Sequence, residues 1–404
     1  MRVSARRGEA SCVDSSPEVP IIGLGKAATP LALCSHLALA SASCSGEVHG
    51  AEEATKNGFD EIVAFTERPS NTECLAEPGA LAERTAPRFL SDFPCVDKDD
   101  PRKVVDGVIS YRPNVELWSD GATKRRYLAV PDGALIQRSL PCDVTSTDPC
   151  EPGEDWELPV GSVLIKEFIL NDITVETRIY MRHTAELWQG YSYAWNDEQT
   201  NAELLETRET RTVSGQSWTY PGMDSCESCH TSAAGVTLGL ETRQLNGTLE
   251  YSNGIEANQL ATLDFIGLLS PGLDSPTAAI ESYTKPGFDE DSSQTARAYL
   301  HANCSMCHRP NGGTFVSMDF RYDTSLAEMN VCDRPSWRSW PTLDDPRLVN
   351  PGNPERSVVL HRMTQNDTFS RMPPIGRTRV DDVGVTSVRR WIASLSGCTD
   401  SESP

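Results

Sequence analysis

The sequence is poor in positive charge and has no long apolar run outside its first residues. It has 404 residues, with 36 Lys and Arg against 58 Asp and Glu, which gives a formal net charge of −22. This balance argues against nucleic acid and against anionic membrane surfaces as partners. No stretch of about 18 uninterrupted apolar residues follows the N-terminal region, so we expect no transmembrane helix in the mature chain.

Residues 1–45 have the features of an export signal. Arginines at the start of this leader precede an apolar, small-residue run at 27–42 that contains A-x-A cleavage candidates. Cys44 is a candidate for lipidation, although the residues before it match a lipobox poorly. We therefore expect a periplasmic or otherwise extracytoplasmic protein whose only contact with a membrane would be a lipid anchor.

Two copies of the pattern C-x-x-C-H are the most specific feature of the chain. The first motif is Cys226, Cys229 and His230, and the second motif is Cys304, Cys307 and His308. Two thiols three positions apart on a helical turn reach the two vinyl groups of one porphyrin, and the adjacent imidazole becomes the proximal iron ligand. The sequence therefore predicts two covalently bound haem c groups.

Zinc binding and thiol redox chemistry are the alternative interpretations of these motifs. C-x-x-C pairs that share one zinc ion usually lie about 12–20 residues apart, whereas these pairs are far apart and each has its own histidine. A thioredoxin-like site requires one pair in a βαβ setting, which the surrounding sequence does not indicate. The haem interpretation is favoured.

The other cysteines favour an oxidising compartment. Of the 13 in the chain, four belong to the two motifs and three lie in the leader. The remaining six suggest disulfides between sequence neighbours, although fifteen pairings are formally possible. These suggested pairs are Cys74–Cys95, Cys142–Cys150 and Cys332–Cys398, of which the short Cys142–Cys150 loop is the best supported.

The chain divides into four expected segments. These are a leader at 1–45, a polar linker at 46–100, a β-rich domain at 101–285 and a helical domain at 286–404. Short β-branched and aromatic runs predict an antiparallel sheet or sandwich in the third segment. The predicted fold class is α+β, with an N-terminal β-rich domain carrying the first haem motif followed by an all-α class I cytochrome c domain. The expected strands are 108–112, 127–130, 134–138, 162–169, 174–181 and 190–195, and the expected helices are 258–266, 294–303, 354–363 and 380–395.

Met372 is the predicted sixth ligand of the second haem. It follows His308 by 64 positions and stands in an Arg-Met-Pro-Pro loop, whose prolines stiffen the backbone that must hold a weak thioether–iron bond. A core methionine is the ordinary alternative, and Met363 is the fallback ligand. We also expect the loop near Pro310 to offer a carbonyl to the other imidazole nitrogen of His308.

The sixth ligand of the first haem stays open. No methionine lies between the two motifs. His183 is the favoured candidate, and Met181 lies on the same side of the expected strand. An open site is a further alternative. Met223 is too close in sequence to His230 to cross the porphyrin easily, and His301 belongs to the surroundings of the second motif.

These residues also carry a family resemblance. The last 110 or so residues resemble class I cytochrome c domains, by the second motif, the Pro- and Gly-rich loop after it and Met372. From about residue 101 to its end the chain is similar to bacterial dihaem c-type proteins, which occur alone or fused to PQQ-dependent sugar dehydrogenase domains. The stretches that carry this similarity are 117–122, 190–197, 226–230, 239–246 and 371–374.

The resemblance implies periplasmic electron transfer between redox proteins. The chain has no PQQ domain of its own, so a periplasmic dehydrogenase acting as donor would be a separate protein, and another cytochrome or an oxidase would be the acceptor. An electron carrier is favoured over an enzyme. The alternatives are a peroxidase-like haem enzyme with an open first iron, and a carbohydrate- or surface-binding module built on the aromatic β region.

Overall fold

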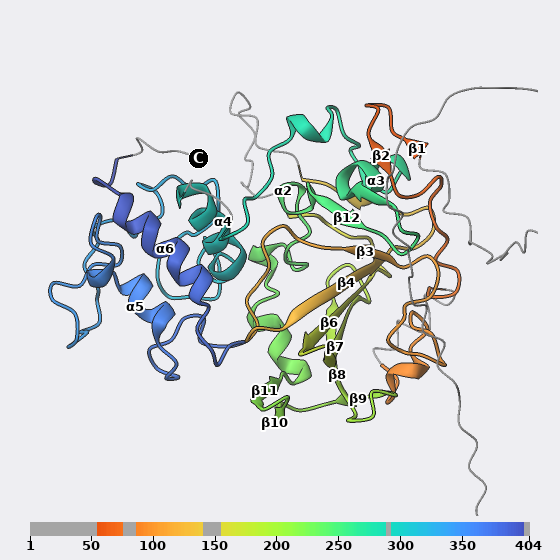
Figure 1. Cartoon of the computed structure of the whole chain (residues 1–404), viewed down its shortest axis with the longest axis horizontal. Helices are drawn as coiled ribbons and strands as arrows, with labels where there is room; N and C mark the ends of the chain where they lie inside the picture. Colours follow the sequence, from red (N-terminus) through yellow and green to blue (C-terminus); the bar gives the residue numbers. More distant parts are fainter. Residues whose placement is uncertain (1–54, 76–85, 140–154, 288–291, 400–404) are drawn as a thin grey trace, which may run out of the picture. The chain divides into compact units, whose positions relative to one another are not determined.

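The structure, a computed structural model, describes residues 55–75, 86–139, 155–287 and 292–399 (Figure 1). The leader, the lipidation candidate Cys44 and the expected Cys142–Cys150 disulfide lie outside these ranges. The largest sheet in the described ranges has six antiparallel strands in the order β3-β4-β6-β7-β8-β9. Its strands are β3 (Ile109–Tyr111), β4 (Thr123–Ala129), β6 (Val163–Leu170), β7 (Ile173–Arg182), β8 (Trp188–Trp195) and β9 (Ala202–Leu205).

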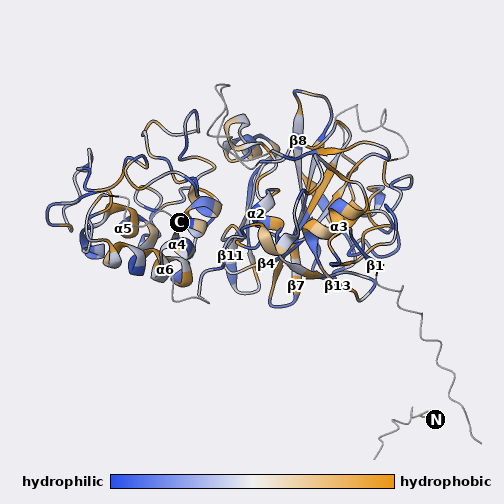
Figure 2. Cartoon of the chain, turned by 90° about the horizontal axis from the view of Figure 1, so that it is seen from above, coloured by the Kyte–Doolittle hydropathy of each residue, from blue (hydrophilic) through white to orange (hydrophobic). Residues whose placement is uncertain are grey.

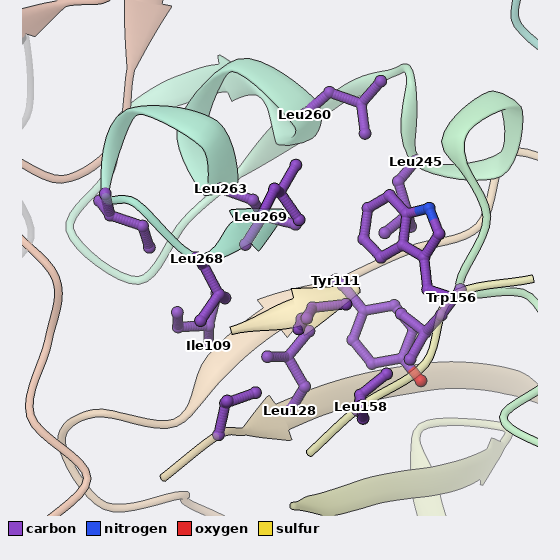
Figure 3. Packing of buried hydrophobic residues seen from close by; sticks show 14 of the residues in the cluster. Ile109, Tyr111, Leu128, Trp156, Leu158, Leu245, Leu260, Leu263, Leu268 and Leu269 are labelled. Atoms are coloured by element: carbon purple, nitrogen blue, oxygen red, sulfur yellow. The ribbon is translucent and has the colours of Figure 1, made fainter. Parts of the chain in front are cut away.

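The two faces of this sheet cover different clusters, because successive side chains of a strand point to opposite sides. Ile165, Ile179 and Tyr191 lie on one face, in a buried cluster that also contains the Cys74–Cys95 disulfide. On the other face, Leu128 and Leu164 join a second cluster. Figure 3 shows that cluster, in which leucines from the short helix α3 (Gln259–Phe265) lie over Leu128 and its neighbours.

The described part of the expected polar linker is packed against the rest of the fold. It contains β1 (Thr55–Lys56), β2 (Ile62–Val63) and the 3-10 turn η1 (Leu90–Asp92). Val63 and Leu90 are completely buried, and the Cys74–Cys95 disulfide joins the two described pieces of this segment. The charged composition of the segment therefore reflects its exposed side chains, whereas its few apolar residues anchor it.

Short hairpins and turns complete the β-rich part. β10 pairs with β11 and β12 pairs with β13, both antiparallel, while β5 and β14 pair in parallel. These strands are β5 (Ile136–Gln137), β10 (Glu209–Val213), β11 (Gln216–Tyr220), β12 (Thr248–Glu250), β13 (Glu256–Asn258) and β14 (Leu269–Ser270). The remaining short elements of this part are η2 (Met223–Ser228), η3 (Ser232–Ala234), α2 (Thr242–Leu245) and η4 (Thr277–Ala279).

The predicted fold class is wrong in its second half. The structure is mainly β with only about 19% helix, and no all-α cytochrome c domain is evident in the described ranges. The segment assigned to that domain contains α4 (Ser292–Cys304), η5 (Pro354–Arg356), α5 (Val358–Thr364) and α6 (Asp382–Ser394). Between α4 and η5 lies a long stretch without helix, rich in Pro, Gly and Asp, residues that favour turns over helices. Helical periodicity therefore locates the helices of this segment, whereas the all-α expectation, which rests on the resemblance to class I cytochrome c domains, is wrong.

Apolar residues concentrate along the strands and in helices such as α3 (Figure 2). Where the structure describes the chain, none of its helices combines the length and apolar content that crossing a bilayer requires. The apolar side chains instead fill internal clusters, including one in which α6 contributes Val388 and Ile392.

Helices α4 and α6 approach each other closely at Gly384. Asp381 caps α6 by accepting a hydrogen bond from the Gly384 N–H, which fixes where the helix begins. A Cβ atom on Gly384 would lie 2.1 Å from the ring of Tyr299 in α4. The absence of a side chain at this position therefore permits the helix–helix contact.

We expect Gly384→Ala to destabilise the protein by about 1–2 kcal/mol, because overpacking a buried contact outweighs the better helix propensity of alanine. Gly313→Ala is the matched control, since a Cβ there meets nothing within 4 Å. Guanidinium unfolding of the three proteins measures the difference. Equal or higher stability of Gly384→Ala would contradict the close contact.

Candidate functional site: two adjacent C-x-x-C-H turns

Both C-x-x-C-H motifs adopt the same backbone turn. In the first motif, the N–H groups of Cys229 and His230 donate to the Cys226 carbonyl at 3.2 and 3.0 Å. In the second, the equivalent N–H groups donate to the Cys304 carbonyl at 3.1 and 2.9 Å. A helical turn of this kind places residues three and four apart on one side, so each motif presents two thiols and an imidazole together.

His230 is held in one tautomer. Its Nδ1 lies 2.6 Å from the carbonyl oxygen of Val236, and a carbonyl only accepts, so Nδ1 carries the proton. Burial lowers the pKa of His230 to about 4, which keeps the ring neutral near pH 7. The Nε2 lone pair is therefore available, as a metal-ligating histidine requires.

The first motif lies on the sheet face that carries Tyr180 of β7 and Gly190 of β8. The Tyr180 ring centroid is 4.5 Å from that of His230 and stacks on Trp188 at 5.0 Å. A Cβ atom on Gly190 would lie 2.3 Å from the Cys226 Sγ atom. The sheet therefore approaches the motif so closely that only glycine fits at this strand position.

The second motif begins at the C-terminal end of α4, where Cys304 is the last helical residue. The His308 ring meets Phe320 edge-on at 5.4 Å between centroids. Burial and the nearby charge of Arg362 lower the pKa of His308 to about 4. The expected hydrogen bond from the Pro310 region is not made, because His308 Nδ1 is buried without a partner in the described part of the chain.

The two motifs lie next to each other. The Cys307 thiol donates to the Ser228 carbonyl inside the first motif, with 3.8 Å between the two atoms. Arg309, which follows His308, donates through Nη1 to the carbonyl of Ala233 at 2.9 Å and to Asp155 at 3.0 Å. Arg309, the residue after His308, thus binds the loop that follows His230.

Met372 lies in a loop that one buried arginine organises. The guanidinium of Arg377 donates to the carbonyls of Met372, Met363 and Gln365 at 3.1, 3.0 and 2.7 Å. The Met372 N–H donates to the carbonyl of Arg362 in α5 at 3.0 Å. Because the charge of Arg362 also acts on His308, the loop with the predicted sulfur ligand lies in the neighbourhood of the second motif.

Met181 and His183, the candidates for the sixth ligand of the first haem, do not lie on the sheet face that meets His230. Met181 belongs to the cluster on the sheet face opposite Tyr180. His183 is buried with its Nε2 atom 3.0 Å from the hydroxyl of Tyr191, a residue of that same opposite cluster. Strand alternation explains the outcome, since Tyr180 and Met181 are consecutive and must face opposite sides.

Both ring nitrogens of His301 are engaged in hydrogen bonds. Its Nδ1 accepts from the Tyr322 N–H at 3.2 Å, and its Nε2 lies 2.9 Å from a carboxylate oxygen of Glu241. Since Nδ1 accepts, Nε2 carries the proton and donates to Glu241. His301 therefore connects α4 to the β-rich part, and neither nitrogen is available to ligate iron.

The cysteines within the described ranges fall into two chemical groups. Cys74 pairs with Cys95 and Cys332 with Cys398, whereas the four motif cysteines are free thiols. Among the residues the structure describes, no three His, Cys, Asp or Glu side chains converge as a metal site.

Sequence reasoning missed Arg309, Asp155, Arg377 and Val236. Arg309 and Arg377 could have been noticed, because each is a charged residue close in sequence to a predicted iron ligand. Nothing in the sequence around them showed that their side chains are buried. Asp155 lies 71 positions before the first motif's Cys226, so only folding reveals that it meets Arg309. No protein-family model, curated protein or solved structure matches this chain.

We expect Arg309→Met to destabilise the protein by about 2–4 kcal/mol, because it leaves the partly buried Asp155 carboxylate without its partner. Arg211→Met is the control, since it removes an exposed pair with Glu209 and we expect a loss below about 1 kcal/mol. Guanidinium unfolding reports both. Similar losses in the two variants would show that Arg309 is an ordinary surface arginine.

Proposed function

We propose that this protein is an exported dihaem c-type electron carrier. The observation that carries the proposal is the pair of adjacent, identically hydrogen-bonded C-x-x-C-H turns with four free thiols. Cys226 and Cys229 would form the thioether links at the first motif, and Cys304 and Cys307 those at the second. Each haem, when bound, would supply an iron that takes up and releases one electron.

The residues around the motifs fit that chemistry. His230 has its proton fixed on Nδ1 by the Val236 carbonyl, so its Nε2 is poised to ligate. At the second motif, Arg377 holds the loop of Met372 through backbone carbonyls, and a thioether ligand held in this way raises the potential of a c-type site. Met372 would therefore make the second site the more oxidising of the two.

The junction at Arg309 supports transfer between the two sites. Electron transfer without bond making requires a short and fixed separation. Arg309 binds both Asp155 and the Ala233 carbonyl beyond the first motif, and its side chain is largely buried. The chain thus fixes the spacing of its two attachment turns with charge-assisted hydrogen bonds.

Export and partner type follow from composition. The two disulfides are consistent with an oxidising compartment, and the leader has the features of an export signal. A net charge of −22 would attract a basic redox partner at low ionic strength. We propose that the donor and acceptor are separate redox proteins, such as a periplasmic dehydrogenase and another cytochrome or an oxidase.

Haem stoichiometry tests the proposal directly. We expect the mature protein, expressed with a c-type maturation system, to carry two haems that acidified acetone does not extract. Cys226→Ser/Cys229→Ser and Cys304→Ser/Cys307→Ser should each carry one, because each motif binds its own porphyrin. Pyridine haemochrome spectra of the three proteins count the covalent haems. Colourless protein, or protein containing zinc in place of iron, would overturn the proposal.

The ligand role of Met372 is tested with a volume-conserving pair. Met372→Leu removes the thioether sulfur and should abolish the far-red sulfur–iron band of the oxidised protein and lower the potential of one haem. Met363→Leu is the matched control, since Met363 is buried in an apolar cluster and leucine has a similar volume. If the band persists in Met372→Leu, another residue ligates the iron.

A further inference from the structure

A row of basic side chains crosses the sheet face that carries the first motif. Arg126 of β4, Lys166 of β6 and Arg178 of β7 are direct cross-strand partners. Like charges that lie directly opposite each other on neighbouring strands are destabilising. We call Arg126, Lys166 and Arg178 the cation row, and its existence requires a compensating feature.

The protein compensates only part of this charge. Arg178 forms two hydrogen bonds to the buried carboxylate of Glu176, at 2.7 and 3.0 Å. Arg126 donates through Nη2 to Glu116 at 3.2 Å, and Glu116 also lies 3.8 Å from the ammonium group of the neighbouring Lys124. One carboxylate is thus divided between two cations.

Two donors of the row stay open. Arg126 is 6% exposed, and its Nη1 atom is buried with no hydrogen-bond partner. Lys166 makes no hydrogen bond or ion pair to another described residue, and its ammonium lies 5.1 Å above the Phe168 ring. Burying a cationic donor without a partner costs free energy, so Nη1 of Arg126 is prepared for an anion that the described residues do not supply, and the half-buried Lys166 beside it adds a second positive charge to the same place.

The row lies beside the first motif. Tyr180, two residues beyond Arg178 on the same face of β7, contacts the His230 ring. Gly190, its cross-strand partner in β8, is the position pressed against Cys226. Lys124 lies two residues before Arg126 on the same face, whereas Leu128 and Leu164, in the next cross-strand row, belong to the core cluster. The cation row therefore adjoins the row of Tyr180 and Gly190 that meets the attachment turn.

We infer that the cation row binds the carboxylates of the porphyrin attached to the first motif, with Lys166 and Nη1 of Arg126 as the donors. The inference rests on the proposed function. A haem c carries two propionate carboxylates, and arginine binds planar carboxylates well. Arg178 stays fixed on Glu176, so Lys166 and Arg126 are the groups that turn a repulsive row into an anion site.

Single-haem chains allow the test. Resonance Raman spectra are compared for Cys304→Ser/Cys307→Ser, which keeps only the first haem, with and without Lys166→Met. We expect the propionate bending band to shift when Lys166 is replaced, because the carboxylate loses a charge-assisted donor. Lys166→Arg should retain the band position, and Lys98→Met, which removes an exposed cation, should leave it unchanged.

Guanidinium unfolding gives an independent readout that depends on the haem. Lys166→Met should lower the unfolding midpoint of the chain that carries the first haem. In Cys226→Ser/Cys229→Ser, which lacks that haem, the same substitution should raise the midpoint, because it removes only repulsion within the row. A merely structural role for Lys166 would lower both midpoints.

The outcomes separate the two proposals. A chain without covalent haem would overturn the proposed function and this inference together. If the unaltered protein carries two haems but Lys166→Met does not shift the propionate band of Cys304→Ser/Cys307→Ser, the inference alone is overturned. It is also overturned if Lys166→Met shifts the band only in Cys226→Ser/Cys229→Ser, which keeps the second haem, because the carboxylates on the cation row would then come from the porphyrin at Cys304 and Cys307.

Discussion

The rest of the site depends on the contact between the two C-x-x-C-H turns through Arg309. This arginine immediately follows His308, and its guanidinium ends on Asp155 and on the carbonyl of Ala233 beyond the first motif. Charge-assisted hydrogen bonds in a poorly hydrated environment are among the stronger polar contacts in proteins. The junction therefore sets the separation of the two imidazoles, and with it any communication between the groups they would hold.

The central sheet performs two tasks because its faces differ. Apart from the Arg125–Glu167 ion pair, one face is mainly apolar and closes over a core that includes the Cys74–Cys95 disulfide. The other is apolar at one end but carries the cation row next to the first motif. A β-strand allows its two faces to differ in this way, because successive side chains point to opposite sides of the sheet. The disulfide-containing core and the proposed porphyrin contacts would thus lie on opposite sides of a single sheet.

The second motif uses a different support. Its thiols and imidazole stand at the end of α4, and the loop with Met372 is held by the many hydrogen bonds of Arg377. A buried arginine bound to several carbonyls can order a loop that has no regular hydrogen bonding of its own. The resemblance to a class I cytochrome c domain had led to an all-α expectation. The Arg377 loop and the long non-helical stretch are what the structure has in its place.

The sequence by itself determined the two C-x-x-C-H turns, the approximate location of the helices and that of the strands from β4 to β8. C-x-x-C-H needs only local spacing, and the strands from β4 to β8 follow from β-branched and aromatic runs, because both signals arise from neighbouring residues. Tertiary structure alone decided which face each strand residue occupies. It therefore placed Met181 and His183 away from His230, engaged both nitrogens of His301, and brought Asp155 to Arg309. Such contacts join residues far apart in sequence, and the free energy that selects them comes from burial and packing of the whole fold, which no local pattern encodes.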